Sequence, residues 1–122
     1  MKNYYGMRKA QEYASAKFYD DAPAEMGSMT CIECYEDYFS LVKLNWGAPD
    51  DYERSKDGEV ELIWTVRDEA LERLKKTCNN AKTPEAVVQY LKERFSPYGK
   101  TAHDELLEWL DKKHISYMYI EY

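Results

Sequence analysis

Apolar residues between positions 32 and 46 recur at steps of three and four, which is the spacing of one face of an α-helix. The residues that follow this spacing are Ile32, Tyr35, Phe39, Val42 and Trp46. Thr30 stands three residues before Glu33, a capping-box pattern that marks the first turn of a helix. The sequence therefore predicts a helix over 30–46.

Four more segments carry helix signals of their own. Apolar and small residues at helical spacing predict a helix over 4–19, which ends before Pro23. Residues 67–80 place small and apolar side chains on one face and ion pairs on the other. A Thr-Pro-Glu sequence at 83–85 and Thr101 both mark helix starts. We therefore predict a mainly α fold of about five helices, forming a single domain over 1–122.

One segment fits two structures equally well. Val60, Leu62, Trp64 and Val66 alternate as in a half-buried strand, whereas the apolar residues from 63 onward also continue the helical face of 67–80. Residues 115–121 are rich in β-branched and aromatic side chains and predict a strand, which needs a partner. The alternative fold is therefore α+β, with a small two-stranded sheet made of residues 60–66 and 115–121.

The charge of the chain argues against several kinds of partner. Seventeen basic and 23 acidic residues give a net charge of −6. Residues 20–61 hold twelve acids against three bases, so their net charge is −9. A surface this acidic repels nucleic acid and anionic lipid and attracts a protein with a basic surface. We therefore expect no direct nucleic-acid binding.

Membrane insertion is not expected either. No apolar run approaches the roughly 20 residues that span a bilayer, and the first residues lack the apolar core of a signal peptide. Three is a small and odd number of cysteines, so a secreted disulfide framework is not expected. A cytoplasmic location is the expectation.

Tyrosine is the one residue type in clear excess, with 12 against three phenylalanines and three tryptophans. Tyrosine combines an apolar ring with a hydroxyl that tolerates water, which suits surfaces that are buried only when a partner binds. Acidic residues and tyrosines occur together in two places, around 35–38 and in the polar loop that starts after Gly47. The candidate partner-binding residues are Tyr35, Asp37, Tyr38, Asp50, Asp51, Tyr52, Glu53 and Asp57.

Cys31 and Cys34 form a Cys-x-x-Cys pair in the first turn of the helix predicted over 30–46, a position that stabilises thiolates. Cys78 with a histidine, His103 or His114, could complete a zinc site, but this second pair lacks the short spacing of metal ligands. Neighbouring acids would also raise the thiol pKa values. We therefore expect no metal and no cofactor, and keep a small thiol or zinc protein as an alternative.

Catalysis is not expected. No Ser/His/Asp or Cys/His arrangement and no glycine-rich phosphate loop is recognisable. The leading hypothesis is a non-enzymatic inhibitor whose acidic, tyrosine-rich surface occupies a basic groove of a protein partner, such as a groove that binds nucleic acid. Phage anti-defence proteins, including anti-CRISPR proteins, and immunity proteins share this composition, an analogy that rests on no motif. A homo-oligomeric structural subunit, such as a homodimer, is a further alternative.

Overall fold

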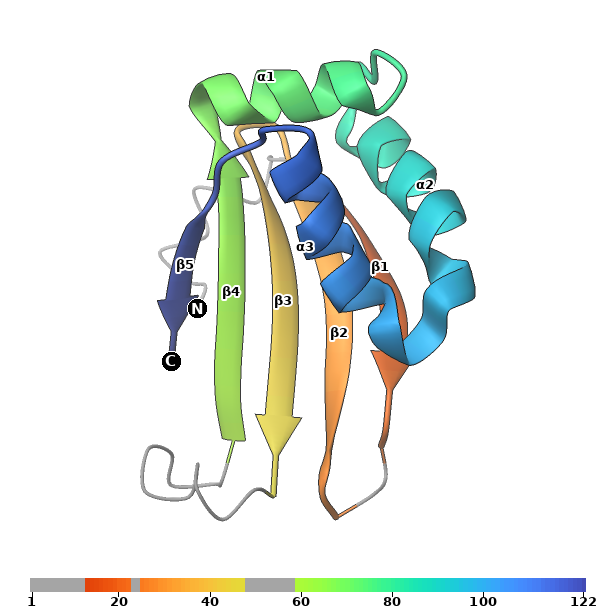
Figure 1. Ribbon diagram of the computed structural model, residues 1–122, viewed down its shortest axis with the longest axis vertical. Helices are drawn as coiled ribbons and strands as arrows, with labels where there is room; N and C mark the ends of the chain where they lie inside the picture. Colours follow the sequence, from red (N-terminus) through yellow and green to blue (C-terminus); the bar gives the residue numbers. More distant parts are fainter. Residues whose placement is uncertain (1–12, 23–24, 48–58) are drawn as a thin grey trace.

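A computed structural model describes residues 13–22, 25–47 and 59–122 (Figure 1). Their central feature is a five-stranded antiparallel sheet in which each strand pairs with its neighbour in the sequence. The strands are β1 (Tyr13–Asp20), β2 (Gly27–Tyr35), β3 (Tyr38–Trp46), β4 (Glu59–Arg67) and β5 (Met118–Glu121). The prediction of a mainly helical fold with about five helices is therefore wrong, and the fold combines helices with a large antiparallel sheet.

The helical part lies between β4 and β5. It consists of α1 (Asp68–Thr77), α2 (Pro84–Phe95), the 3-10 segment η3 (Ser96–Thr101) and α3 (Ala102–Lys112). α2 and α3 begin where the start signals at 83–85 and 101 predict them, and α1 lies within the helix predicted over 67–80 from its spacing. Thr83 caps α2, its hydroxyl accepting a hydrogen bond from the amide of Ala86 at 3.2 Å. No helix in the described part of the chain is long and apolar enough to cross a membrane.

The helix predicted over 30–46 is instead a β-hairpin of β2 and β3, joined by the two residues Glu36 and Asp37. The helical spacing arises because both faces of the hairpin carry apolar side chains. Ile32 and Phe39 lie on one face, whereas Val42 and Trp46 lie on the other. Reading the two faces together gives steps of three and four without any helix.

The other uncertain segments also form strands. Of the helix predicted over 4–19, residues 13–20 form β1, and residues 1–12 lie outside the described part of the chain. Residues 59–67 form β4, which pairs with β5 through Leu62 with Glu121 and Trp64 with Tyr119. The alternative of a two-stranded sheet of 60–66 and 115–121 is wrong as a sheet, because β4 pairs with β5 over Met118–Glu121 as one edge of a five-stranded sheet.

α2 and α3 lie over one face of the sheet, and α1 crosses the end at which β4 finishes (Figure 1). α2 packs against β1 and β2, and α1 packs against β3 and β4. Between the layers lies one apolar core, whose fully buried members include Ile32, Phe39 and Leu41 from the sheet and Leu91 and Leu106 from the helices. Cross-strand neighbours share a face, so the register places Tyr13, Tyr35, Tyr38 and Arg67 in one row on the opposite face of the sheet.

Candidate functional site

Three tyrosines form a continuous stack on the face of the sheet that α2 and α3 do not cover. The ring centroids of Tyr13 and Tyr35 lie 4.9 Å apart with an interplanar angle of 17°. Those of Tyr35 and Tyr38 lie 4.5 Å apart at 15°. We call these three residues the tyrosine stack. It crosses β1, β2 and β3, and thus brings together two of the predicted binding residues and one that was not predicted.

The stack is more exposed at its Tyr13 end than at its Tyr38 end. Tyr35 and Tyr38 are half-buried, whereas Tyr13 is 55% exposed. Burial raises the pKa of the Tyr35 hydroxyl, and the nearby carboxylate of Glu33 raises it further. The Tyr35 hydroxyl therefore stays protonated at neutral pH and can donate a hydrogen bond. The stack presents rigid rings with polar ends, the combination that recurs in protein interfaces.

Acidic residues flank the stack at the tip of the hairpin. Glu36 and Asp37 form the turn between Tyr35 and Tyr38, and both acids are exposed. The predicted residues Tyr35, Asp37 and Tyr38 therefore do lie together. They have an exposed aromatic neighbour in Tyr13, which lies 22 positions before Tyr35 in the sequence and opposite it in the sheet.

The negative charge of the described chain belongs to the sheet rather than to the helices. The helical segment 68–117 holds nine acids and nine bases. The described residues before and after it hold only the bases Lys17, Lys43 and Arg67, against the acids Asp20, Asp21, Glu25, Glu33, Glu36, Asp37, Glu59, Glu61 and Glu121. Charge therefore distinguishes the strands and their turns from the helices packed on them.

The other five predicted binding residues, Asp50, Asp51, Tyr52, Glu53 and Asp57, lie outside the described residues. The described strands on either side, β3 and β4, pair along their whole length. Trp46 and Glu59 pair with each other, whereas Tyr38 pairs with Arg67 at the other end of the same strands. Eight residue steps along a strand span about 26 Å. Trp46 and Glu59 thus lie at the end of these strands opposite the tyrosine stack.

The Cys-x-x-Cys pair was predicted at the start of a helix, and this prediction is wrong. Both cysteines lie within β2. Successive side chains on a strand alternate between faces, so Cys31 and Cys34, three residues apart, point to opposite sides of the sheet. Cys34 and Cys78 are buried in the core. No group of three metal-binding side chains occurs among residues 13–22, 25–47 and 59–122.

Comparison with known proteins adds no relative. The chain matches no family model, no curated protein and no solved structure.

A buried histidine in the core is a feature that the sequence did not reveal. His103 lies in the first turn of α3, is 3% exposed and meets the Trp64 ring edge to face at 4.5 Å. Its Nε2 is buried and has no hydrogen-bond partner among the described residues. Burial lowers the pKa of this imidazole, and the Lys43 charge lowers it further, against the opposing effect of Asp104. The packed fold therefore favours the neutral ring.

Because the pKa of His103 is lowered in the folded state, we expect the folded protein to lose stability in mild acid. Because the pKa of His103 in the folded state is lowered from 6.5, the unfolded chain takes up the proton first as the pH falls through 6.5. The free energy of unfolding should therefore decrease from there down to the lower folded pKa. Urea titrations between pH 7.5 and 5 should show this slope, and His103→Gln should flatten it. His114→Asn, at an exposed position, is the matched control and should keep the slope. An unchanged slope in His103→Gln would contradict the assignment.

Proposed function

We propose that the chain is a non-enzymatic binding protein that docks the tyrosine stack and the acids beside it onto a basic surface of a protein partner. The single observation that carries the proposal is the stack itself, three parallel rings beside two exposed carboxylates. The proposal assigns no catalytic role to any side chain. It places the protein in the cytoplasm, where its three free cysteines stay reduced.

Two physical effects would act in sequence during binding. The carboxylates of the sheet and its turns attract a cationic partner over a distance of about one Debye length, roughly 8 Å in physiological salt. The tyrosine rings then lose water against the partner and slow its dissociation. Stacking on neighbouring rings restricts Tyr35 before binding, so less side-chain entropy is lost when the partner arrives.

A basic groove that binds nucleic acid is the kind of partner surface that suits this design. Such a groove presents lysine and arginine side chains spaced to meet phosphates, and carboxylates can take the place of those phosphates. Occupying the groove would inhibit the partner, as anti-CRISPR and immunity-type proteins inhibit theirs. The comparison with those proteins is one of mechanism, not of ancestry.

The experiment is affinity capture from a lysate of the natural host, followed by binding kinetics with the captured protein. We expect Glu36→Gln/Asp37→Asn to slow association by roughly three- to ten-fold at low salt, with little change in dissociation. Tyr13→Ala/Tyr35→Ala should speed dissociation by roughly ten-fold or more, because buried aromatic anchors dominate interface energy.

Glu85→Gln/Glu93→Gln provides the matched control, since it removes two exposed acids from α2 on the other side of the molecule. This control should leave both rates unchanged. A partner whose binding ignores salt and both stack-side variants would disprove the docking surface. A partner captured equally by all variants would place the binding site elsewhere.

A homodimer is a second candidate, favoured by the composition of β5. Met118, Tyr119, Ile120 and Tyr122 are 42–64% exposed at one edge of the described sheet. Edge strands with exposed apolar side chains can pair with a second chain. Sedimentation at several concentrations decides between the candidates, because a dimer through this edge would gain mass with concentration and Ile120→Lys would abolish the gain.

A further inference from the structure

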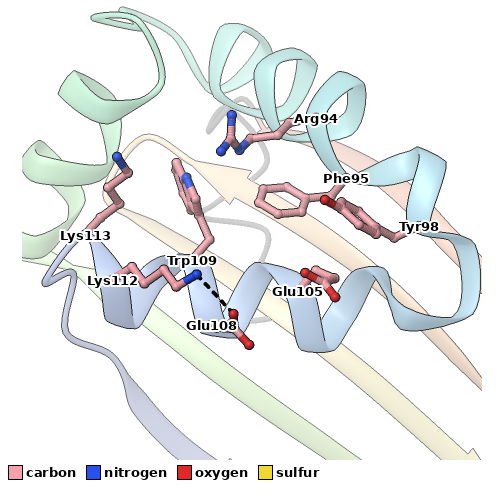
Figure 2. A pocket seen from close by; sticks show the side chains of 8 residues that line it. All are labelled: Arg94, Phe95, Tyr98, Glu105, Glu108, Trp109, Lys112 and Lys113. Atoms are coloured by element: carbon pink, nitrogen blue, oxygen red, sulfur yellow. Dashed lines mark ion pairs between the residues drawn. The ribbon is translucent and has the colours of Figure 1, made fainter.

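A cleft of about 450 Å³ lies between α2 and α3, on the helical side of the molecule (Figure 2). Phe95 and Trp109 form its apolar wall, with their rings edge to face at 5.6 Å. Tyr98 adds a third ring, 6.2 Å from Phe95. A volume of this size falls in the range of sites for small organic molecules, which combine an apolar wall with a few polar groups.

Arg94 is the cation beside this aromatic wall. Its guanidinium carbon lies 5.7 Å from the ring centroid of Phe95 and 5.6 Å from that of Trp109. No described carboxylate lies within ion-pair distance of Arg94. Because Arg94 already holds the cation–π position over both rings, the wall is poorly suited to a second cation. A guest that carries a negative charge would instead pair with the guanidinium.

Two more charges decide the polarity of the cleft. Lys112 pairs with Glu108 at 3.2 Å, so these two charges largely cancel. Lys113 lines the cleft at the C-terminal end of α3 without a described carboxylate partner. Glu105 lines it two turns earlier in the same helix and also has no described cationic partner. The cleft therefore favours an anionic group near Arg94 and Lys113 and disfavours one near Glu105.

The indole of Trp109 supplies an independent sign of an acceptor-bearing guest. Trp109 is 6% exposed, and its Nε1 is buried without a hydrogen-bond partner in the described part of the chain. The indole N–H can only donate, and leaving a buried donor unpaired costs about 1–3 kcal/mol. An oxygen of a bound ligand could accept this hydrogen bond after a small movement of the side chains that line the cleft.

We propose that the α2–α3 cleft binds a small aromatic anion, such as an aryl phosphate or an aryl carboxylate. The ring of the ligand lies against the exposed ring of Tyr98 and the small exposed part of Trp109, and its acidic group faces Arg94 and Lys113. The site is distinct from the tyrosine stack, on the other side of the sheet, so each can be tested without the other.

The test follows the indole N–H of Trp109 by ¹H–¹⁵N correlation NMR during titration with phenyl phosphate. Trp109→Phe assigns this signal among the three tryptophans of the chain. We expect a saturable shift of the Trp109 signal with phenyl phosphate and a weaker response to inorganic phosphate or phenol alone. An equal affinity for inorganic phosphate would overturn the aromatic part of the proposal, and the absence of a shift would overturn all of it.

Two substitutions, at the exposed Arg94 and at the half-buried Glu105, give opposite expectations. Arg94→Gln should weaken binding roughly ten-fold, because hydrogen bonds to charged groups are the strong ones. Glu105→Gln should strengthen binding roughly two- to five-fold by removing a repulsive charge. Lys82→Gln removes an exposed cation before the start of α2 and should change nothing. Weaker binding in Glu105→Gln, or unchanged binding in a folded Arg94→Gln variant, would overturn the proposal.

Discussion

Phe39→Ala is expected to lower the free energy of unfolding by about 3–5 kcal/mol, a large part of the 5–15 kcal/mol typical of a domain. Phe39 is fully buried on β3, where it pairs with Cys34 of β2 and Val66 of β4 beneath the helices. Truncation leaves a cavity that rigid neighbours on three strands cannot fill. Guanidinium denaturation followed by circular dichroism measures the loss.

Tyr38→Ala is the matched control for this prediction. Tyr38 precedes Phe39 in the sequence, but the Tyr38 side chain lies half-buried in the tyrosine stack on the opposite face of the sheet. We expect a cost clearly smaller than that of Phe39→Ala, because less apolar area leaves a buried environment. Equal costs for the two variants would mean that the core does not lie on the face that the register assigns.

The α-helices could be predicted because their signals are local. The Thr83 hydroxyl caps α2 and the Pro84 ring occupies its first position, so both signals for the start of α2 are independent of distant residues. The hairpin over 30–46 could not be predicted in the same way. Its apolar side chains lie on both faces, so the strand period of two is hidden, and only pairing with β1 and β4 settles the structure.

The binding surface was predictable only in part for the same reason. Tyr35 and Tyr38 flank a two-residue turn, and the local cluster of tyrosines and acids around them predicted a binding surface. Tyr13 joins them solely through the register of β1 on β2, which no short-range pattern encodes. Arg94 and Trp109 likewise meet because α2 and α3 lie side by side, although each residue alone resembles an ordinary helix position.

Native thiol reactivity should be lower than that of a free cysteine by about two to three orders of magnitude. Burial raises the pKa of Cys31 and of Cys34 from 9.0 to about 11, and that of Cys78 to about 12. Nearby acids add to the effect at Cys31. Only the thiolate attacks an alkylating reagent, so at pH 8 the reactive fraction falls roughly 100-fold or more before steric protection is counted.

Iodoacetamide labelling at pH 8, analysed by mass spectrometry, measures the three rates, and the same labelling in urea supplies the unprotected reference. A raised folded pKa also means that stability contributed by these thiols is lost as the pH rises from 9 towards 11. Any cysteine that reacts in the native state as fast as in urea would contradict the raised pKa of that thiol. A β-strand directs the Cys31 and Cys34 side chains to opposite faces, so the structure does not favour a reactive pair. Fast labelling of both cysteines would show two accessible thiolates and would favour the alternative of a thiol protein.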